Sequence, residues 1–235
     1  MKVAAMQPYF FPYLGYFSLL KHTDRFIIFD IGQYISQGWI ARNRILKDSG
    51  WAYINVPLHA HSRDMIIKDV RINNEFDWKK KILNQIHNYP KRTPYLSEVE
   101  ELCKSLFLEE YNDIVSLNVK ALELVLEYLG ISRHIEVLSK MDLEIEHPND
   151  SDEWALNICR ALKNVDEYWN PPGGKTFYDR SKYERVGIKL YFQEVVLTQY
   201  DQRRDHFEPG LSILDVMLFN PVDDINKMLD NYTLS

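Results

Sequence analysis

The first thirty residues constrain the fold most, because they alternate between strand-like and helix-like patterns. Lys2–Met6 is a short, mostly apolar run that predicts a buried strand. After a loop, apolar residues recur at three-residue spacing within 13–22, which predicts a helix. Phe26–Phe29 is a second continuous apolar run. The order strand, loop, helix, strand predicts a βαβ unit, in which two parallel strands are joined by a right-handed crossover.

The rest of the chain adds a hairpin and a helical region to this unit. Trp39–Lys47 and Trp51–Leu58 flank a short polar turn and predict a β-hairpin. Met65–Ile72 is predicted as a further strand. Helical periodicity from 77 to 130 predicts a helical subdomain packed against the parallel sheet. Further strands are predicted at Ile135–Leu138 and Arg185–Glu194, and further helices over 151–162, 212–219 and 223–229.

These patterns predict an α/β fold: a Rossmann-like parallel sheet with a small β-hairpin insertion and a helical subdomain. The chain has 235 residues, which suits a single domain spanning 1–235. The net charge is −6 and no long basic run occurs, which disfavours non-specific nucleic-acid binding.

The sequence also bears on the compartment. No stretch reaches the roughly 18 apolar residues of a membrane-spanning helix, and no signal-peptide pattern is present. Cys103 and Cys159 each lie in a helical-looking stretch, as buried thiols of a reducing compartment do. We therefore expect a cytoplasmic protein.

Five candidate ligand-binding side chains crowd the loop and helix that follow the first strand. In open α/β sheets, ligands bind at the carboxyl ends of the strands. Pro8 and Pro12 stiffen this loop, and Gly15 would let a ligand approach the unpaired N–H groups of the next helix. The alternative is that the rings belong to the core. The five expected pocket residues are Gln7, Tyr9, Phe10, Tyr13 and Tyr16.

A basic, aromatic segment stands at the start of the predicted hairpin. Arg42 and Arg44 share one face if this segment is a strand, with Asn43 between them and Trp39 nearby. Two guanidinium groups on one face can bind a phosphate or carboxylate group through paired hydrogen bonds. The alternative is a solvated strand with ordinary surface arginines.

Two residues are candidates for catalysis. Asp30 ends the second predicted strand, where a carboxylate can act as a base or orient a substrate hydroxyl, and Gln33 follows in the next loop. His61, in the loop after the hairpin, is a candidate general base. Each has an alternative, as a turn residue or an exposed loop residue. His59 and His61 lack further ligands at motif spacing, so we predict no metal site.

Two later segments complete the set of candidate binding residues. Tyr89 and Tyr95 bracket a stiff, proline-containing loop between helices, which can line a sugar or nucleotide site or serve only as a connection. The segment from Tyr168 to Tyr178 contains Pro-Pro-Gly-Gly-Lys and is similar to a phosphate-binding turn, without the full spacing of such loops. Its glycines allow close backbone approach. They are Gly173 and Gly174.

The N-terminal segment resembles the start of the adenylate-forming nucleotidyltransferases. In that family the first strand is followed by a loop and an H-x-G-H motif, and the matching positions here read Tyr13-Leu14-Gly15-Tyr16. The resemblance implies a nucleotidyltransferase-like fold with a nucleotide-shaped pocket. Tyrosine supplies no cation near neutral pH, whereas histidine can. The replacements therefore argue against retained nucleotidyl transfer.

Three stretches together resemble the WbqC-like family, over Met1 to about Pro221. They are Met6-Gln-Pro-Tyr-Phe-Phe-Pro-Tyr-Leu-Gly-Tyr16, Gly38-Trp-Ile-Ala-Arg-Asn-Arg44 and Phe207-Glu-Pro-Gly-Leu-Ser-Ile-Leu-Asp215. That family is encoded in O-antigen and related surface-polysaccharide clusters. The resemblance implies an enzyme that modifies an activated sugar, by acyl or aminoacyl transfer to a sugar amine. The implied partner is a small molecule, a nucleotide sugar or acyl donor; cofactors and oligomeric state are not predicted.

Three functions remain open at this point. The first is an enzyme of glycan-precursor assembly, the second a nucleotidyl- or adenylyl-transferase, and the third a non-catalytic binding or scaffold protein of the same pathway. Three polar and aromatic motifs are more than a scaffold requires. Within the third motif, Ser212 and Asp215 have the spacing of a helix-capping box.

Overall fold

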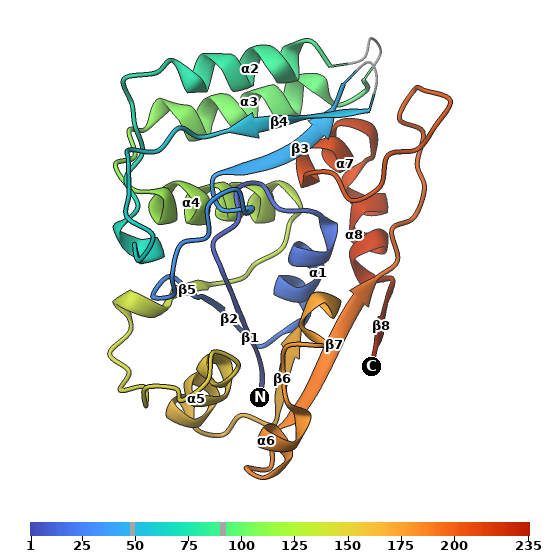
Figure 1. Cartoon of the computed structure of the whole chain (residues 1–235). Helices are drawn as coiled ribbons and strands as arrows, with labels where there is room; N and C mark the ends of the chain where they lie inside the picture. Colours follow the sequence, from blue (N-terminus) through green and yellow to red (C-terminus); the bar gives the residue numbers. More distant parts are fainter. Residues whose placement is uncertain (48–49, 90–92) are drawn as a thin grey trace.

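The computed structural model describes residues 1–47, 50–89 and 93–235. Its main element is a six-stranded sheet with the order β5-β2-β1-β6-β7-β8 (Figure 1). The first five strands in this order run parallel, and β8 pairs antiparallel with β7. The strands are β1 (Lys2–Met6), β2 (Arg25–Ile28), β5 (Ile135–Val137), β6 (Glu167–Asn170), β7 (Lys189–Val195) and β8 (Tyr232–Leu234). The predicted parallel pairing of the first two strands is confirmed.

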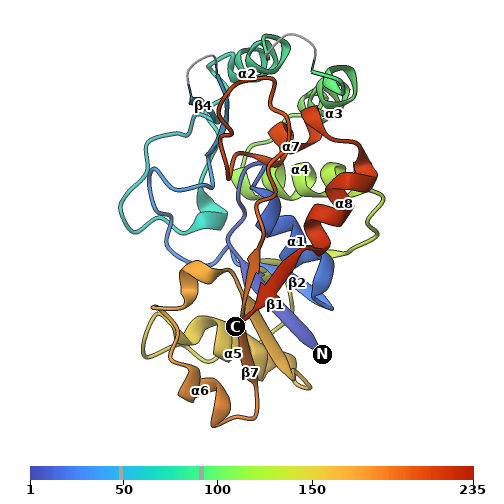
Figure 2. The same cartoon turned by 90° about the vertical axis from the view of Figure 1, so that its right-hand side faces the viewer.

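The sheet is covered on both faces because side chains alternate along its buried strands. On β1, Val3 faces the core beside α5 (Glu153–Leu162) and α6 (Arg180–Glu184), whereas Ala4 faces the core beside α1 (Leu14–His22). α8 (Val222–Asp230) lies beside α1 on that second face. Figure 2 shows α5 and α6 apart from α1 and α8.

The predicted hairpin is confirmed and forms a separate two-stranded sheet. β3 (Arg42–Leu46) pairs antiparallel with β4 (Trp51–Asn55), and Asp48 and Ser49 of its predicted turn lie outside the described residues. In Figure 1 the hairpin lies between α2 and the six-stranded sheet.

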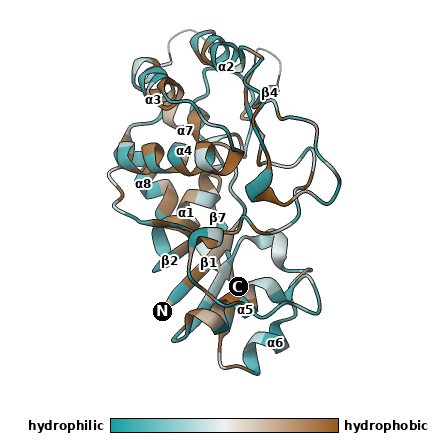
Figure 3. Cartoon of the chain, turned by 90° about the vertical axis from the view of Figure 1, so that its left-hand side faces the viewer, coloured by the Kyte–Doolittle hydropathy of each residue, from teal (hydrophilic) through white to brown (hydrophobic). Residues whose placement is uncertain are grey.

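The helical region from 77 to 130 is also confirmed. It contains α2 (Trp78–His87), α3 (Leu96–Leu108) and α4 (Ile114–Tyr128). α2 packs on α3 and β4, and α3 packs on α7 (Ile213–Phe219). Figure 3 shows hydrophobic and hydrophilic residues alternating along α2 and α3, as expected for helices with one buried face.

Two strand predictions were wrong in type or extent. Met65–Ile72 is no strand. It contains the short 3-10 helix η1 (Ile67–Asp69), and among the described residues it pairs with other segments only through isolated β-bridges. Its buried residues are held by loop contacts rather than by a sheet. The segment Arg185–Glu194 joins the sheet only from Lys189 onward, because residues 185–187 form a turn that follows α6.

β6 was missed from the sequence, although it is the strand next to β1 in the middle of the sheet. It is only four residues long and leads directly into Pro171 and η3 (Pro172–Gly174). The following Pro-Pro-Gly-Gly run gave a turn signal that hid the strand before it. A further short 3-10 turn, η2 (Leu138–Lys140), follows β5.

Candidate functional site

The strand order reverses between β1 and β6, and two cavities lie at the carboxyl ends of these strands. The chain passes from β1 outward through β2 to β5, and then returns to the other side of β1 with β6 and β7. At such a reversal, the loops of neighbouring strands leave in opposite directions and open a crevice where ligands bind. Met6 ends β1 and Pro171 follows β6, and both residues line both cavities, together with Tyr9.

The first cavity, which we call cavity A, has a volume of about 340 Å³ and lies toward the hairpin. Its wall combines aromatic rings, one cation and an apolar side chain from a loop late in the chain. The lining residues beyond the shared three are Pro12, Tyr13, Trp39, Asn43, Arg44, Leu197 and Gly210.

The second cavity, cavity B, has a volume of about 430 Å³ and lies toward α5 and the turn after β6. Trp154 and Phe177 contribute large aromatic rings to it, and Phe29 packs against Trp154 with a centroid distance of 5.7 Å. Gln7, Tyr168, Asn170, Gly173, Gly174 and Tyr178 also line it.

The loop between β1 and α1 is fixed in place by hydrogen bonds to its carbonyl groups. Asn118 Nδ2 donates to the Pro8 carbonyl at 2.7 Å, and Tyr16 Oη donates to the Gln7 carbonyl at 2.9 Å. Asn43 Nδ2 donates to the carbonyls of Phe10 and Phe11. Asn43 is thus a structural part of the cavity wall as well as a lining residue.

The same loop contains one backbone conformation that requires outside support. Phe11 has a φ of +41°, which is rare and strained for a bulky residue. Its carbonyl accepts hydrogen bonds from Asn43 Nδ2 and from Ser212 Oγ, the latter at 2.7 Å. These bonds hold the strained turn, which in turn places Tyr9 and Tyr13 at the cavities before any ligand binds.

Phe10 and Tyr16 line neither cavity, unlike the other three expected residues of this segment, Gln7, Tyr9 and Tyr13. Both side chains have 0% exposure. Phe10 packs edge-on against Phe11, and the Tyr16 ring lies 5.2 Å from Phe26. The loop is long enough to send some rings inward, where apolar burial is favourable, while Tyr9 and Tyr13 remain partly exposed.

The absence of a side chain at Gly15 leaves room for the Tyr13 ring rather than for a ligand. A Cβ at Gly15 would lie 2.5 Å from the ring and hydroxyl atoms of Tyr13. The ring therefore occupies the space above the first turn of α1, where the sequence had suggested access for an anion. Gly174 is similar, since a Cβ there would meet the Asn170 amide at 2.2 Å and the Tyr178 ring at 2.9 Å.

Arg44 lines cavity A and Arg42 does not. The Arg44 guanidinium carbon lies 5.5 Å from the centre of the Trp39 ring and 5.3 Å from that of Trp51, and Nη2 donates to the Gly210 carbonyl at 3.0 Å. The Arg42 guanidinium instead lies 4.2 Å above the Tyr53 ring and donates to the Gln37 carbonyl. Only Arg44 is placed to meet a ligand in these cavities.

The two candidate catalytic residues lie outside both cavities. Asp30 is 1% exposed, and its two carboxylate oxygens accept from the Ser139 backbone N–H, at 3.0 Å, and from the Ser139 hydroxyl. His61 contacts the Ser36 hydroxyl and the His59 carbonyl. Asp30 therefore anchors a turn, and the position of His61 gives it no access to a ligand in cavity A or B. Gln33 also lines neither cavity, and its Nε2 donates to the Arg63 carbonyl.

Tyr89 and Tyr95 are also outside the two cavities. Tyr89 is buried, and its hydroxyl donates to Asp215 Oδ1 at 2.6 Å and accepts from the Leu46 N–H at 2.8 Å. Tyr95 lies half-buried at the start of α3. Pro90, Lys91 and Arg92, between them, lie outside the described residues.

Asp215 is the centre of a buried network that the capping-box spacing did not predict. Ser212 does cap α7, because its hydroxyl accepts from the Leu214 N–H. Asp215, with 0% exposure, accepts instead from Tyr89, Tyr200 and Gln202. This network holds the loop that carries Leu197 and Gly210 to cavity A.

The tyrosines of the site are neutral hydrogen-bonding groups. Burial raises the pKa of Tyr9, and burial together with nearby Tyr9 and Glu194 raises the pKa of Tyr13. Burial, with the neighbouring Tyr178 and Tyr183, raises the pKa of Tyr168 well above its ordinary value. These phenols can donate and accept hydrogen bonds and offer ring faces, but do not supply phenolate at neutral pH.

Lys182 occupies the one group of acidic side chains in the described part of the chain that has the geometry of a metal site. Asp150, Asp152 and Glu153 bring their carboxylates together beside α5. The Lys182 ammonium lies 2.9 Å from both Asp152 and Glu153 and 3.3 Å from Asp150. These carboxylates raise the pKa of Lys182 and keep it charged, so an ammonium already neutralises the group.

Several cavity residues had no clear sequence signal. Trp154 was visible only as an aromatic at the start of a predicted helix, and Leu197 lies in a loop with no motif that marks it. Gly210 belongs to the third family motif, but nothing in that motif indicated that it lines a cavity. Asn118 has 0% exposure within α4, as do Ile114, Leu117 and Leu122 near it on the same helix. A buried amide in such a helix must find partners, and that requirement is the signal that would have found it.

One of the comparisons with known proteins identifies a family. Residues 7–227 match the model of the WbqC-like protein family. An uncharacterized protein of Mycobacterium tuberculosis, Rv1507c, is 30% identical over 222 residues, which cover 93% of each chain. No solved structure matches the chain. With a match over nearly its whole length, the chain belongs to the WbqC-like protein family.

Proposed function

We propose that this protein is a cytoplasmic transferase of bacterial surface-polysaccharide, or O-antigen, precursor biosynthesis. It binds a nucleotide-linked amino sugar where the strand order reverses, and it transfers an acyl or aminoacyl group to the sugar amine. The sheet is a Rossmann-like, nucleotidyltransferase-like one, in which five parallel strands with the β1/β6 reversal support a nucleotide site.

One observation carries this proposal: two cavities meet at a shared wall of Met6, Tyr9 and Pro171. A transferase must hold a donor and an acceptor at once, with their reacting atoms close together. The two cavities provide separate compartments with a common boundary. Arg44 offers a cation to a phosphate group in cavity A, and the aromatic rings of Trp154 and Phe177 offer flat apolar surfaces in cavity B.

Nucleotidyl transfer is less well supported. At the position of the second histidine of the H-x-G-H motif, Tyr16 is fully buried and donates to the Gln7 carbonyl. At the position of the first, the Tyr13 ring covers the first turn of α1. Neither side chain supplies positive charge to a phosphate.

A non-catalytic sugar-binding protein is the second candidate, because of one feature of the lining. Among the described residues that line cavities A and B, none is Asp, Glu, His or Cys. A reaction there would use an acceptor amine that is already unprotonated and a donor with a good leaving group. Binding without a reaction requires neither an unprotonated amine nor a leaving group.

A screen of binding and turnover separates these functions. Thermal shift and native mass spectrometry would be measured with nucleotide sugars, nucleotides and acyl thioesters, since a ligand that binds only the folded state raises its stability. Binding of a nucleotide amino sugar, with a product heavier by one acyl group when the thioester is added, supports the transferase. Binding without product supports the second candidate, and no selective binding of nucleotide sugars contradicts both.

The variants Tyr9→Ala and Tyr95→Ala form a matched pair for this screen. Each removes a partly buried tyrosine, but only Tyr9 lines the cavities. Ligand binding should weaken about tenfold or more in Tyr9→Ala, which corresponds to about 1.4 kcal/mol, and stay unchanged in Tyr95→Ala.

A further inference from the structure

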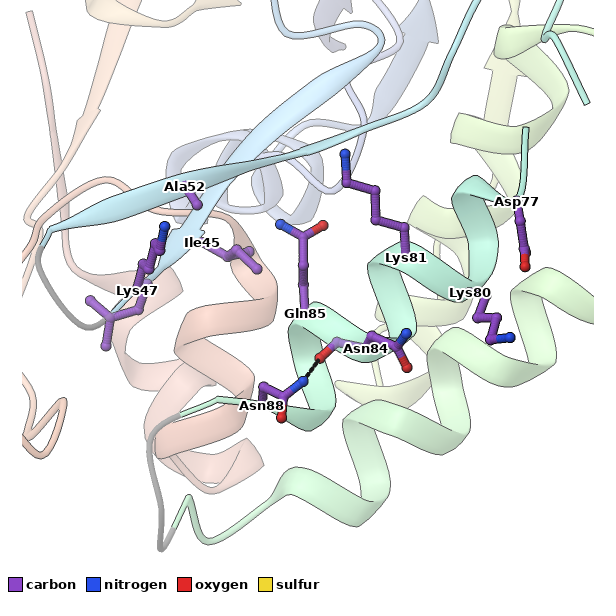
Figure 4. A pocket seen from close by; sticks show the side chains of 10 residues that line it. Ile45, Lys47, Ala52, Asp77, Lys80, Lys81, Asn84, Gln85 and Asn88 are labelled. Carbon is purple, nitrogen blue, oxygen red and sulfur yellow. Dashed lines mark hydrogen bonds between the residues drawn. The ribbon is translucent and has the colours of Figure 1, made fainter. Parts of the chain in front are cut away.

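A groove between the hairpin and α2 has the features of a second ligand site. Its volume is about 570 Å³, and none of its lining residues also lines cavity A or B. Figure 4 shows it bounded by β3 and β4 on one side and by α2 on the other. The lining residues are Ile45, Leu46, Lys47, Ala52, Asp77, Lys80, Lys81, Asn84, Gln85 and Asn88.

The side of α2 that faces the hairpin is polar, which is unusual for a helix packed beside another element. The apolar stripe of α2, with Trp78, Ile82 and Ile86, is buried in the core. Residues 77, 81, 84, 85 and 88 form a second stripe at helical spacing, and all of them line the groove. The helix therefore presents polar side chains to the groove, while Ile45, Leu46 and Ala52 of the hairpin contribute apolar ones.

Gln85 bridges the groove and keeps one hydrogen-bonding atom unused. Its Nε2 donates to the Tyr53 carbonyl of β4 at 3.0 Å, which fixes the distance between helix and hairpin. Its Oε1 is buried and has no partner among the described residues. A buried oxygen of this kind is costly unless a donor reaches it, and a ligand hydroxyl is such a donor.

The charges at the groove are unbalanced. Lys47, Lys80 and Lys81 line it, against the single carboxylate of Asp77, in a chain whose net charge is −6. None of the three ammonium groups forms an ion pair within residues 1–47, 50–89 and 93–235. Figure 4 shows Gln85 pointing toward the hairpin, with Lys47 and Lys81 on either side of it.

We propose that this groove binds a hydroxyl-rich small molecule that carries an anionic group, such as a sugar phosphate or a sugar acid. Ile45 and Ala52 provide an apolar surface for the C–H face of a sugar ring. The amides of Asn84, Gln85 and Asn88 suit hydroxyl groups, which both donate and accept. The lysines attract the phosphate or carboxylate, so affinity falls as salt rises. This site does not depend on the function proposed for cavities A and B.

The test is a titration of the full chain, followed by amide chemical shifts, with four probes. Glucose 6-phosphate and glucuronate carry both features, whereas glucose and inorganic phosphate each carry one. We expect glucose 6-phosphate or glucuronate to shift the amides of α2 and β4, with an affinity at least tenfold above that of glucose and of phosphate. The two anionic probes distinguish a phosphate ligand from a carboxylate ligand.

Two double variants complete the test. Lys47→Ala with Lys81→Ala should weaken binding at least fivefold, and the unchanged Gln85 bridge keeps the groove in place. Lys68→Ala with Lys140→Ala removes two exposed lysines that line no part of the groove, and should leave binding unchanged. The inference is overturned if no probe shifts α2, if phosphate alone binds as tightly as glucose 6-phosphate, or if the first double variant binds like the native chain.

Discussion

At the scale of single residues, Arg44 and Arg42 show how neighbouring side chains on one strand acquire different roles. Arg44 lines cavity A between two tryptophan rings, whereas Arg42 stacks on Tyr53 away from both cavities. We expect Arg44→Ala to weaken binding of a nucleotide sugar tenfold or more, because a charge-assisted contact contributes about 1.5–3 kcal/mol. Arg42→Ala should change the affinity less than threefold. Equal losses in calorimetric titrations of the two variants would contradict this assignment.

At Gly15 we predict a substitution that lowers ligand affinity but hardly changes the stability of the fold. In Gly15→Ala the new methyl group displaces the Tyr13 ring, whose contacting atoms are at the far end of a movable side chain. Alanine is also favoured over glycine within a helix by about 1 kcal/mol. We expect the free energy of unfolding in urea to change by less than about 1 kcal/mol, while ligand affinity in cavity A falls. Unchanged affinity would show that the position of Tyr13 does not matter for binding.

Asp215 gives a prediction about pH. Burial raises the pKa of this carboxyl above its ordinary value of 3.8, even though three hydrogen bonds from Tyr200, Tyr89 and Gln202 oppose the shift. The folded state therefore holds the proton more tightly, and the contribution of Asp215 to stability falls as pH rises from about 4 through the raised pKa. The stability of the native chain minus that of Asp215→Asn should decrease over this interval in urea titrations. A difference that grows with pH would contradict a raised pKa.

At the scale of elements, the central feature is the β1–α1 loop and the partners that hold it. Asn118 of α4 donates to the carbonyls of Pro8 and Ile40, and so joins this loop to the hairpin entrance. Asn118→Ala leaves both carbonyls without this partner in a fully buried position, which should cost about 2–4 kcal/mol. Asn84→Ala, at an exposed site on α2, is the control and should change stability by less than about 0.5 kcal/mol. Similar urea midpoints for the two variants would exclude this role for Asn118.

The elements also show what the sequence could and could not predict. Continuous apolar runs identified β1 and β2, helical periodicity identified α1 and the helices of 77–130, and a polar turn between two strand-like runs identified the hairpin. It failed for β6, whose four residues lead directly into a proline-glycine turn, and for η1, whose buried residues resemble those of a strand. Of the candidate site, Gln7, Tyr9, Tyr13 and Arg44 are among the residues that line cavities A and B. Phe10 and Tyr16 do not, since a pattern of aromatic residues does not reveal which rings turn inward.

At the scale of the whole molecule, one hydrophobic core connects the N-terminal unit to the rest of the chain. The larger core cluster extends from Ala4 on β1 to Leu229 on α8 and includes residues of the hairpin and of α2, α3 and α4. We therefore propose that 1–235 forms a single domain, with the helical region as part of it. No helix among the described residues is long and apolar enough to cross a membrane.

The arrangement of the whole molecule brings four distant segments to one place. The β1–α1 loop, the hairpin, the turn after β6 and the loop with Leu197 and Gly210 all meet at cavities A and B. Each is held by a neighbour rather than by the ligand, so little reorganisation is needed on binding. Pre-formed sites of this kind are typical of small-molecule binding.

The central claim is that a nucleotide-linked sugar binds at the β1/β6 reversal, and hydrogen–deuterium exchange with and without that ligand tests it most directly. We predict slower exchange at 5–13 and 168–178, at the carboxyl ends of β1 and β6, and little change in α3 or α8. Arg44→Ala should reduce this protection at the same ligand concentration. Protection confined to other segments, or none at a concentration where binding is otherwise detected, would contradict the assignment of cavities A and B as the functional site.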